Sequence, residues 1–285
     1  YVIMKVLNKM EKGLTSKMQQ SIRDRLFYDA KRWVFEASEL IKQSFISPLN
    51  VEYKTNFSDL VTNVDKQVEQ FFIQKIHKTY EDHHVLGEEG FGDEEVTKEG
   101  ITWIIDPIDG TTNFVNQQRH FAISLAIYED GVGQIGIIYD VMSDEMFHCR
   151  SGEGAYLNNK RLPMLEKKPL SEALIGINAS WLIKNRRIDS RILTPLVNKV
   201  RGIRSYGSAA IEIAYVASGR LDGYISLRLS PWDFAAGKLL MAEVGGTITK
   251  IDGKDVELFK QNTIFAANPF IHKKILESFI LPKLN

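Results

Sequence analysis

The chain has a single cysteine, Cys149, among its 285 residues, and it has no apolar run long enough to cross a membrane. One cysteine closes no disulfide within the chain and builds no zinc site alone, which predicts a reducing compartment, the cytoplasm. Excess charge of one sign is absent too, because 36 Lys+Arg balance 36 Asp+Glu. Without an overall field to attract nucleic acid or anionic lipid, we expect neither a nucleic-acid partner nor a membrane partner.

The composition present is that of a globular protein, with 44% hydrophobic and 25% charged residues. It excludes disordered, collagen-like and coiled-coil chains, and the length allows two domains or one large unit with an ample core. Charged residues such as Lys5, Lys9 and Glu11 interrupt any apolar stretch of the kind found in signal peptides. Residues 1–19 are interpreted as an N-terminal arm or a vector-derived remnant and carry no fold prediction.

Residues 20–164 carry helical patterns followed by strand patterns. Apolar residues three to five apart predict a long helix from Ser21 that Pro48 ends, and a second stripe predicts a helix over 63–80 with Thr62 or Asn63 as its cap. Short apolar runs at 85–86 and 101–105 lead directly into acidic residues, as buried strands do. Three β-rich runs between 121 and 150, separated by turn signals, predict an antiparallel meander.

Residues 165–285 alternate between strand and helix patterns. Strands are predicted at 173–179, 221–229 and 247–251, and helices at 188–201, 205–219, 233–243 and from His272 onward. The fold class is therefore α+β, with an antiparallel N-terminal half beside an α/β C-terminal half in layers of sheets and helices.

Segment 103–114, WIIDPIDGTTNF, carries the clearest chemical signal. A buried strand is predicted to end at Asp106, Pro107 imposes an extended turn, and Asp109 follows three residues later. Two carboxylates and the carbonyl between them then converge, and such hard oxygen ligands select Mg²⁺ or a related ion. Gly110 lacks a side chain and Thr111 opens a predicted helix, whose free N–H groups face an anion. Taken alone, Asp-Pro-x-Asp-Gly is also a common turn sequence.

At its full length, segment 103–114 resembles the first signature of the inositol monophosphatase family. The segments WDFAAG at 232–237 and EVGG at 243–246 are similar to the second signature. GEEG at 87–90 and TNVD at 62–65 stand in the family's order and spacing. The resemblance covers about residues 20–275. It implies an α/β/α/β/α sandwich of the sugar-phosphatase type and the hydrolysis of a phosphate monoester.

The resemblance implies two to three Mg²⁺ ions as cofactors. One ion is held by Glu88, Asp106 and the backbone carbonyl of Ile108, and a second by Asp106, Asp109 and Asp233. Glu88 with waters is implied for a weaker third ion. The arrangement is physically reasonable, because like charges about 4 Å apart cost about 4 kcal/mol per pair at an effective dielectric near 20, and cations offset that repulsion.

The resemblance also implies roles in the reaction. Asp65 and the Thr111 hydroxyl orient and deprotonate the attacking water beside Glu88, and the N–H groups of Gly110 and Thr111 hold the phosphate. On local grounds alone, each acidic residue has a plainer interpretation. Glu88 also suits a solvated loop, Asp65 also complements a helix dipole, and Asp233 is also a good helix N-cap.

On the substrate side the resemblance implies Asp109, Asp233, Gly207, Ser208, Ala209 and Ser226. Ser226 stands where animal members of the family have a glutamate that accepts hydrogen bonds from inositol hydroxyls. One charge-assisted contact of about 1.5 to 3 kcal/mol is then missing. Arg228, two residues further along the same predicted strand and face, either favours a second phosphate or is a surface arginine.

The expected substrate is a small phosphorylated polyol, sugar or nucleotide, first of all myo-inositol 1-phosphate. NADP(H) 2′-phosphatase or fructose 1,6-bisphosphatase activity on the same site is the alternative, and a non-catalytic metal-binding scaffold is a remote one. The resemblance further implies a homodimer and sensitivity to lithium. His77, His83 and His84 lack the spacing of a metal site. The basic residues of 184–191 suit a solvated face or an interface.

Overall fold

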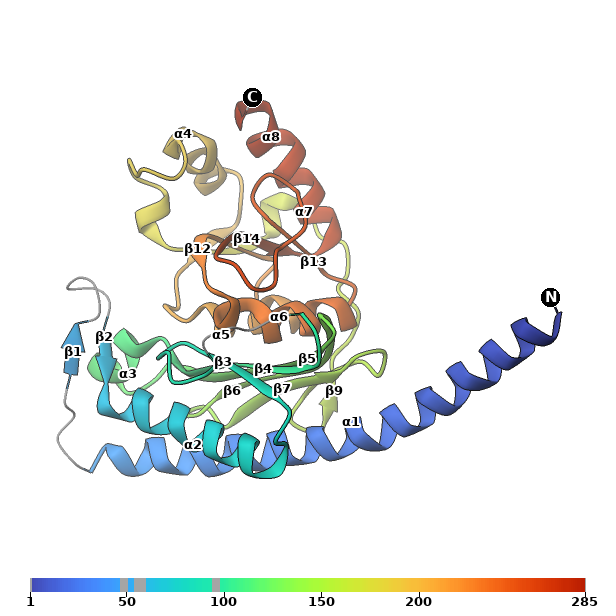
Figure 1. Ribbon diagram of the computed structural model, residues 1–285. Coiled ribbons are helices and arrows are strands. Elements are labelled where there is room, and N and C mark those ends of the chain that lie inside the picture. Colours follow the sequence, from blue (N-terminus) through green and yellow to red (C-terminus); the bar gives the residue numbers. More distant parts are fainter. Residues whose placement is uncertain (1, 47–50, 54–59, 94–97, 285) are drawn as a thin grey trace.

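The computed structural model describes residues 2–46, 51–53, 60–93 and 98–284, and side chains from residue 20 onward within these ranges except Tyr53 and Leu60. Its elements stack in five layers, as Figure 1 shows from bottom to top. Helices α1 (Val2–Ser44) and α2 (Asn63–Thr79) form the first layer and a seven-stranded sheet the second. Helices α5 (Ala209–Ala217) and α6 (Pro231–Glu243) separate this sheet from a five-stranded sheet. Helices α4 (Ser190–Leu193) and α7 (Pro269–Ile275) cover the outer face.

The seven-stranded sheet confirms the predicted meander. Its strand order is β3-β4-β5-β6-β7-β8-β9, and every neighbouring pair is antiparallel except β3 and β4, which run parallel. The strands are β3 (His84–Gly87), β4 (Ile101–Asp109), β5 (Ala122–Glu129), β6 (Val132–Asp140), β7 (Glu145–Arg150), β8 (Ala155–Leu157) and β9 (Lys160–Arg161). A separate pair, β1 (Val51–Tyr53) with β2 (Leu60–Thr62), was not predicted.

The five-stranded sheet has the order β11-β10-β12-β14-β13 and mixes parallel with antiparallel pairs. The strands are β10 (Leu174–Ile177), β11 (Gly202–Arg204), β12 (Gly223–Leu229), β13 (Thr247–Thr249) and β14 (Asn262–Ala267). The sequence patterns missed β11 and β14. The strand β14 is short and stands between polar and proline-containing turns, so no clear period distinguishes it.

The helix predictions hold with shorter bounds in the C-terminal half. The helix expected at 188–201 is α4 followed by a 3₁₀ turn, η3 (Thr194–Asn198), because Pro195 cannot continue the α-helical bonding. The chain ends in α7, a π-helical turn η4 (Leu276–Ile280) and α8 (Leu281–Leu284). Further short elements are α3 (Thr111–Gln117), η1 (Leu170–Glu172) and η2 (Ala179–Trp181). Pro48, expected to end the first helix, lies outside the described residues.

Alternation along β4 shows how the layers form. Trp103 and Ile105 pack into the core between the seven-stranded sheet and helices α1 and α2, whereas Ile104 between them packs into the core that contains α5 and α6. Both faces of the strand are therefore buried, which explains its nearly continuous apolar run. A third core lies between the five-stranded sheet and the outer helices.

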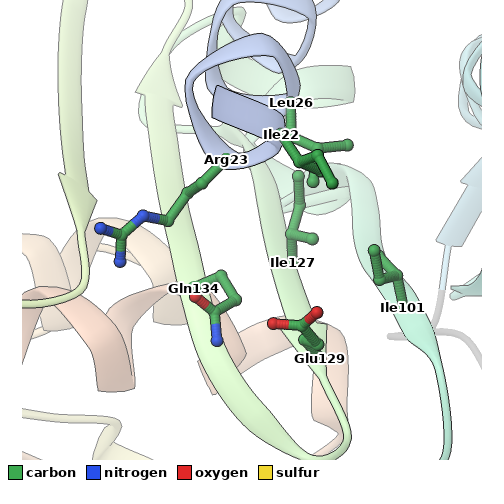
Figure 2. A pocket seen from close by; sticks show the side chains of 7 residues that line it. All are labelled: Ile22, Arg23, Leu26, Ile101, Ile127, Glu129 and Gln134. Atoms are coloured by element: carbon green, nitrogen blue, oxygen red, sulfur yellow. The ribbon is translucent and has the colours of Figure 1, made fainter. Parts of the chain in front are cut away.

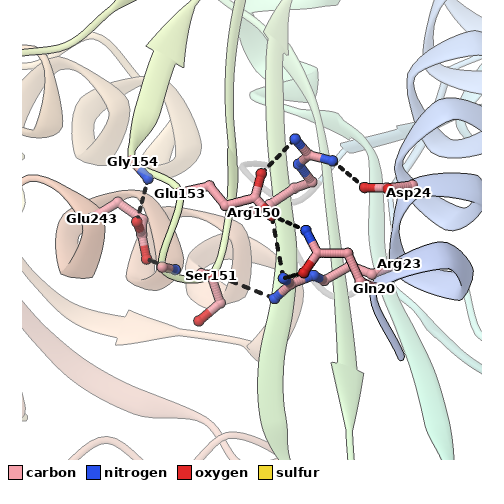
Figure 3. Close-up of polar contacts among 9 residues, drawn as sticks. Gln20, Arg23, Asp24, Arg150, Ser151, Glu153, Gly154 and Glu243 are labelled. Atoms are coloured by element: carbon pink, nitrogen blue, oxygen red, sulfur yellow. Dashed lines mark hydrogen bonds and ion pairs between the residues drawn. The ribbon is translucent and has the colours of Figure 1, made fainter. Parts of the chain in front are cut away.

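Polar contacts fasten α1 and α6 to the β7–β8 turn (Figure 3). Arg150 forms ion pairs with Asp24 of α1 and with Glu153, and Arg23 pairs with Glu153 at 3.2 Å. On the other side, Glu243 at the end of α6 accepts the N–H groups of Gly152 and Gly154 at 2.7 and 2.6 Å. The same face of α1 borders a small, mainly apolar cavity at Ile22, Leu26 and Ile127 (Figure 2). Among the described residues, no helix combines the length and apolarity needed to cross a bilayer.

Candidate active site

A β-bulge brings the first two carboxylates together. Asp106 pairs with Ser124 of β5, and Asp109 pairs with Ala122, so three steps along β4 correspond to two along β5. In a regular strand, residues three apart point to opposite faces, and the extra residue turns Asp109 toward the side of Asp106. The expectation that the strand ends at Asp106 is therefore wrong: β4 continues through the bulge to Asp109. Pro107 fits there because a bulge leaves one residue out of the ladder.

The third carboxylate comes from the N-terminus of α6. Asp233 accepts the backbone N–H of Ser230 at 2.8 Å in a capping box, in which Ser230 is the N-cap and Asp233 the third residue of the helix, so the interpretation of Asp233 as the N-cap itself is wrong. The same side chain also joins the cluster, because one carboxylate oxygen each of Asp106, Asp109 and Asp233 lies within 4.8 Å of the others. Among the described residues, no other group of three His, Cys, Asp or Glu side chains converges in this way.

Burial and mutual repulsion make the cluster a poor place for bare negative charge. Burial, then the neighbouring Glu88 and the other aspartates, raises the pKa of Asp106 well above its usual range. Burial followed by Asp109 and Glu88 does the same for the pKa of Asp233. The pKa of Asp109 rises to about 6 through burial, although bonds from Ser208 and Ala210 oppose the rise. A set of buried oxygen ligands that repel one another fits a divalent cation, which offsets that repulsion.

Asp65 and Thr111, expected to act as a pair, lie in contact. The Thr111 hydroxyl is 3.3 Å from Asp65 Oδ1 and 3.2 Å from the carbonyl oxygen of Ile108. Thr62 caps α2 and donates from both its N–H and its hydroxyl to Asp65 Oδ2, at 2.9 and 2.5 Å. Asp65 is fully buried, and burial raises its pKa to about 6 despite the Thr62 bonds.

Glu88 follows β3, whose parallel pairing with β4 brings the ends of both strands to one edge of the sheet. Its charge raises the pKa of Asp65, Asp106, Asp109 and Asp233, and its side chain is hydrogen-bonded to that of Asp106, so Glu88 lies beside the cluster. The solvated-loop interpretation of Glu88 does not describe this position.

The segment 207–209 packs against the loop that follows β4. Gly207 has φ +82° and Gly110 has φ +98°, left-handed conformations that favour glycine. A Cβ on Gly110 would stand 3.2 Å from Ser208 Cβ and 3.3 Å from the Gly207 carbonyl oxygen, so the two loops touch. Ser208 caps α5 through the N–H of Ile211 and donates to Asp109 Oδ2 at 2.5 Å. Ala209, the next residue, is almost fully buried.

The regular alternation on which the predicted shared face of Ser226 and Arg228 depends does not continue along the whole of β12. The pairing of β12 with β14 shifts between Ser226 and Leu229, so a second bulge interrupts the alternation. Ser226 is 4% exposed, whereas Arg228 is exposed. Arg228 nevertheless lies near the carboxylates, because its charge lowers the pKa of Asp233.

The three histidines form no metal cluster with one another. His83 accepts a hydrogen bond from the indole N–H of Trp103 at 3.0 Å, and burial lowers its pKa. His77 and His84 each face Asp93, at 3.9 and 3.5 Å.

Three polar residues next to the site, Asn113, Glu69 and Glu212, were not predicted from the sequence. Asn113 donates from Nδ2 to the carbonyl oxygens of Tyr206 and His120, at 2.6 and 2.8 Å. Glu69 and Glu212 are buried on α2 and α5. The available signal was a single glutamate within an apolar run, which is clearest in AAIEIAYVA at 209–217.

Comparison with known proteins identifies the family to which the chain belongs. The model of the inositol monophosphatase family matches residues 23–280, and the match includes every carboxylate described above. The chain belongs to the inositol monophosphatase family.

Among curated members of this family, the inositol-1-monophosphatase of Bacillus subtilis (strain 168) is 53% identical over 251 residues, covering 88% of this chain and 95% of that protein. The fructose-1,6-bisphosphatase/inositol-1-monophosphatase of Thermotoga maritima is 36% identical over 228 residues, covering 80% and 85%. Both matches therefore cover at least four fifths of this chain and of the relative.

Solved structures of inositol monophosphatases have the same fold. Inositol monophosphatase-II from Staphylococcus aureus MSSA476 has a TM-score of 0.84 at 42% identity, with 91% of this chain and 94% of that chain covered. An IMPase/NADP phosphatase complexed with Mg²⁺ and phosphate has a TM-score of 0.83 at 28% identity, with 90% and 95% covered. The layered sandwich is therefore the fold of this family, and the chain is a phosphatase that hydrolyses phosphate monoesters.

Proposed function

We propose that this inositol monophosphatase family member hydrolyses myo-inositol 1-phosphate to myo-inositol and phosphate, with Mg²⁺ and a water nucleophile. The observation that carries the proposal is the convergence of Asp106, Asp109 and Asp233 beside the Asp65–Thr111 contact. A structural metal site needs the first three residues only, so the adjacent pair argues against a non-catalytic scaffold. The name of the Bacillus subtilis relative supports the substrate.

The proposed ligands fit Mg²⁺ by their chemistry. Glu88, Asp106 and the Ile108 carbonyl would hold one ion, and Asp106, Asp109 and Asp233 a second, with Glu88 also serving a third. Orienting hydrogen bonds hold a single oxygen of Asp109 and of Asp233, which leaves the second oxygen of each for a cation. Held by these residues, Mg²⁺ would supply Lewis acidity, which would lower the pKa of a water nucleophile and offset negative charge on the phosphoryl oxygens and the leaving alkoxide.

The protein's own groups supply the remaining steps. Asp65 accepts a hydrogen bond from the Thr111 hydroxyl, and together they orient the attacking water and take up its proton at the Asp65 carboxylate. The N–H groups of Gly110 and Thr111 hold the phosphate. Asp109, Asp233 and the segment 207–209 face the polyol, together with Ser226.

The test is phosphate release from myo-inositol 1-phosphate with Mg²⁺ or with EDTA. We expect Asp65→Asn to lower kcat by about 10²- to 10⁴-fold, as loss of a general base does. Asp106→Asn, which removes a ligand proposed for both ions, should abolish the phosphate release that depends on Mg²⁺. Asp252→Asn, at a surface turn remote in sequence from every proposed ligand, serves as the matched control. Full turnover by the folded Asp65→Asn variant contradicts the proposed roles. The proposed function is overturned if the parent protein releases phosphate from none of the tested phosphate esters in a metal-dependent way.

A second candidate is hydrolysis of a substrate with two anionic groups, such as NADP or fructose 1,6-bisphosphate. The observation that favours it is a basic rim beside β12, made of Arg228 and the segment 184–191. Arg187 donates to the carbonyl oxygen of Leu227 at 3.4 Å, which ties this segment to the strand that leads to Asp233. Ser226 is uncharged, so it adds no negative charge that would repel a second anionic group.

The two candidates separate on relative kcat/KM. If a second anionic group binds this rim, Arg228→Gln should lower kcat/KM for fructose 1,6-bisphosphate about tenfold and leave myo-inositol 1-phosphate nearly unchanged, since a charge-assisted bond contributes about 1.5 to 3 kcal/mol. Arg201→Gln is the control. Equal effects on both substrates contradict a second anion site.

We also propose a homodimer inhibited by lithium and located in the cytoplasm. The family resemblance supports the first two statements. The single cysteine, Cys149, supports the third, because one cysteine closes no disulfide within the chain. Light scattering of the purified chain and phosphate release in LiCl test assembly and inhibition.

A further inference from the structure

Two buried glutamates outside the proposed ligand set each hold a loop of the site by its backbone. Glu69 of α2 is fully buried and accepts the N–H groups of Glu89 at 2.7 Å and of Phe91 at 2.9 Å. Glu212 of α5 is 3% exposed and accepts the N–H groups of Tyr206 and Gly207, at 2.5 and 3.2 Å. Burying a carboxylate this deeply costs folding free energy unless hydrogen bonds compensate for the lost water.

Each glutamate occupies space that a glycine on a neighbouring strand leaves open. A Cβ on Gly87, at the end of β3, would overlap the carboxylate of Glu69. A Cβ on Gly176, in β10, would stand 2.7 Å from Glu212 Oε2. Both carboxylates therefore lie against the backbone of a strand, at a distance that no larger residue permits.

The clamped loops are the two that supply or orient proposed metal ligands. Glu89 and Phe91 are one and three residues after Glu88, so the Glu69 bonds hold the segment that follows Glu88. Tyr206 and Gly207 directly precede Ser208, which donates to Asp109 at 2.5 Å. Asn113 holds the same loop from the other side through the carbonyl oxygen of Tyr206.

We propose that Glu69 and Glu212 are positioning residues of this phosphatase, Glu69 for Glu88 and Glu212 for the Ser208–Asp109 contact. The inference rests on the metal site of the proposed function. Glu69 lies in the N-terminal part of the chain and Glu212 in the C-terminal part. Glu88 and Asp109 are therefore each supported by a different buried glutamate. Groups that orient metal ligands change metal affinity by about 10- to 100-fold when removed.

The two clamps differ in a way that isosteric substitution reveals. Glu69 uses both oxygens, Oε2 for Glu89 and Oε1 for Phe91. Glutamine would present its NH₂ group to one of these N–H donors, so Glu69→Gln must break a bond. Glu212 uses Oε1 alone, and in the described part of the chain its Oε2 has no hydrogen-bond partner. Glu212→Gln keeps both bonds through its carbonyl oxygen.

The experiment has two measurements. Calorimetry gives the affinity for Mg²⁺, and amide hydrogen exchange of the metal-free protein reports the protection of individual backbone N–H groups. We expect Glu69→Gln to weaken Mg²⁺ binding about tenfold or more and to speed exchange at Glu89 and Phe91 only. Glu212→Ala should weaken binding similarly and speed exchange at Tyr206 and Gly207 only. Glu212→Gln should stay within about threefold of the parent on both measurements, because its bonds remain. Glu36→Gln, on the surface of α1, is the matched control.

A structural role alone would lower the stability of every variant without changing Mg²⁺ affinity below the unfolding transition. Parent-like Mg²⁺ affinity in folded Glu69→Gln and Glu212→Ala therefore overturns the proposal, as does an equal loss in Glu212→Gln and Glu212→Ala. Should Glu69→Gln fail to fold, Glu69→Asp, which keeps two oxygens on a shorter stem, replaces it. If the parent releases no phosphate but these binding and exchange results hold, the proposed function fails and the positioning roles stand.

Discussion

The carboxylates of the site are held away from their ordinary ionisation, and this makes metal binding depend on pH. Burial raises the pKa of Asp109 to about 6, and burial with the charges of neighbouring carboxylates raises the pKa values of Asp106 and Asp233 well above their usual range. As the pH falls, protons therefore compete with Mg²⁺ for these carboxylate oxygens more strongly than they would at ordinary aspartates. We expect affinity to fall about tenfold per pH unit for each displaced proton as the pH falls from 7 to 5. Calorimetry at three pH values measures this, and constant affinity contradicts it.

Ser208 connects helix capping to the chemistry of Asp109. Ser208→Ala removes the cap of α5 and the bond to Asp109, so we expect a loss of about 1 to 2 kcal/mol in unfolding free energy. The Ser208 bond is the main influence that lowers the pKa of Asp109, so its loss should also move the Mg²⁺ binding curve to higher pH. Urea denaturation and calorimetry check both effects, with Ser208→Thr as the control that keeps a hydroxyl. Unchanged stability would disprove the cap contribution.

Helix α6 packs closely against α5 and against strand β6 because a glycine stands at each contact. A Cβ on Gly237 would stand 2.5 Å from Ile213 Cγ2 of α5, and a Cβ on Gly136 of β6 would stand 2.8 Å from the Ala236 carbonyl oxygen. This close approach brings the N-terminus of α6, and with it Asp233, to the bulge of β4. Glycine inside a helix normally costs about 1 kcal/mol relative to alanine.

Gly237→Ala should nevertheless destabilise the protein, by about 1 to 3 kcal/mol, because overpacking outweighs the gain in helix propensity. In the double variant Gly237→Ala/Ile213→Ala the clash is absent, so its loss of stability should be smaller than the sum of the two single losses. Chemical denaturation of the four proteins provides the cycle. Additive losses, or a stabilising Gly237→Ala, would contradict the proposed contact.

The elements themselves differ in how far sequence predicts them. The stripe of α2 and its cap at Thr62 follow from local spacing, as do the three strands of the meander, because each pattern lies within one segment. The strands β11 and β14 were missed, since a short strand is defined by its neighbours more than by its own residues. The bulges at 106–109 and 226–229 were missed as well, because register is a property of two strands.

Across the whole molecule, the site joins the two parts of the chain. Asp106 and Asp109 come from the seven-stranded sheet, and Asp233 from the helix layer between the sheets. The division at residue 164/165 stays a prediction, and α6, which follows it in the sequence, packs directly against the first sheet. A cation held by all three aspartates therefore binds only the folded chain.

Metal removal should accordingly lower the stability of the entire fold. At a free Mg²⁺ concentration 100 times the dissociation constant, we expect the free energy of unfolding to exceed that of the EDTA-treated protein by about 2.7 kcal/mol. Asp106→Asn, which lacks a shared ligand, should lose this increment. Denaturant unfolding with and without Mg²⁺ measures it. An equal effect of Mg²⁺ on the parent and on Asp106→Asn would show that the cation stabilises the protein elsewhere.

The sequence by itself determined the kinds of element, the family signatures and the types of ligand atom, because spacing and residue chemistry are local and are printed in the chain. Tertiary structure alone decided which oxygens meet. The bulge that turns Asp109 toward Asp106, the register shift between Ser226 and Leu229, and the bonds of Glu69 and Glu212 all depend on partners distant in sequence. Their positions follow from packing and strand register, and no single segment contains that information.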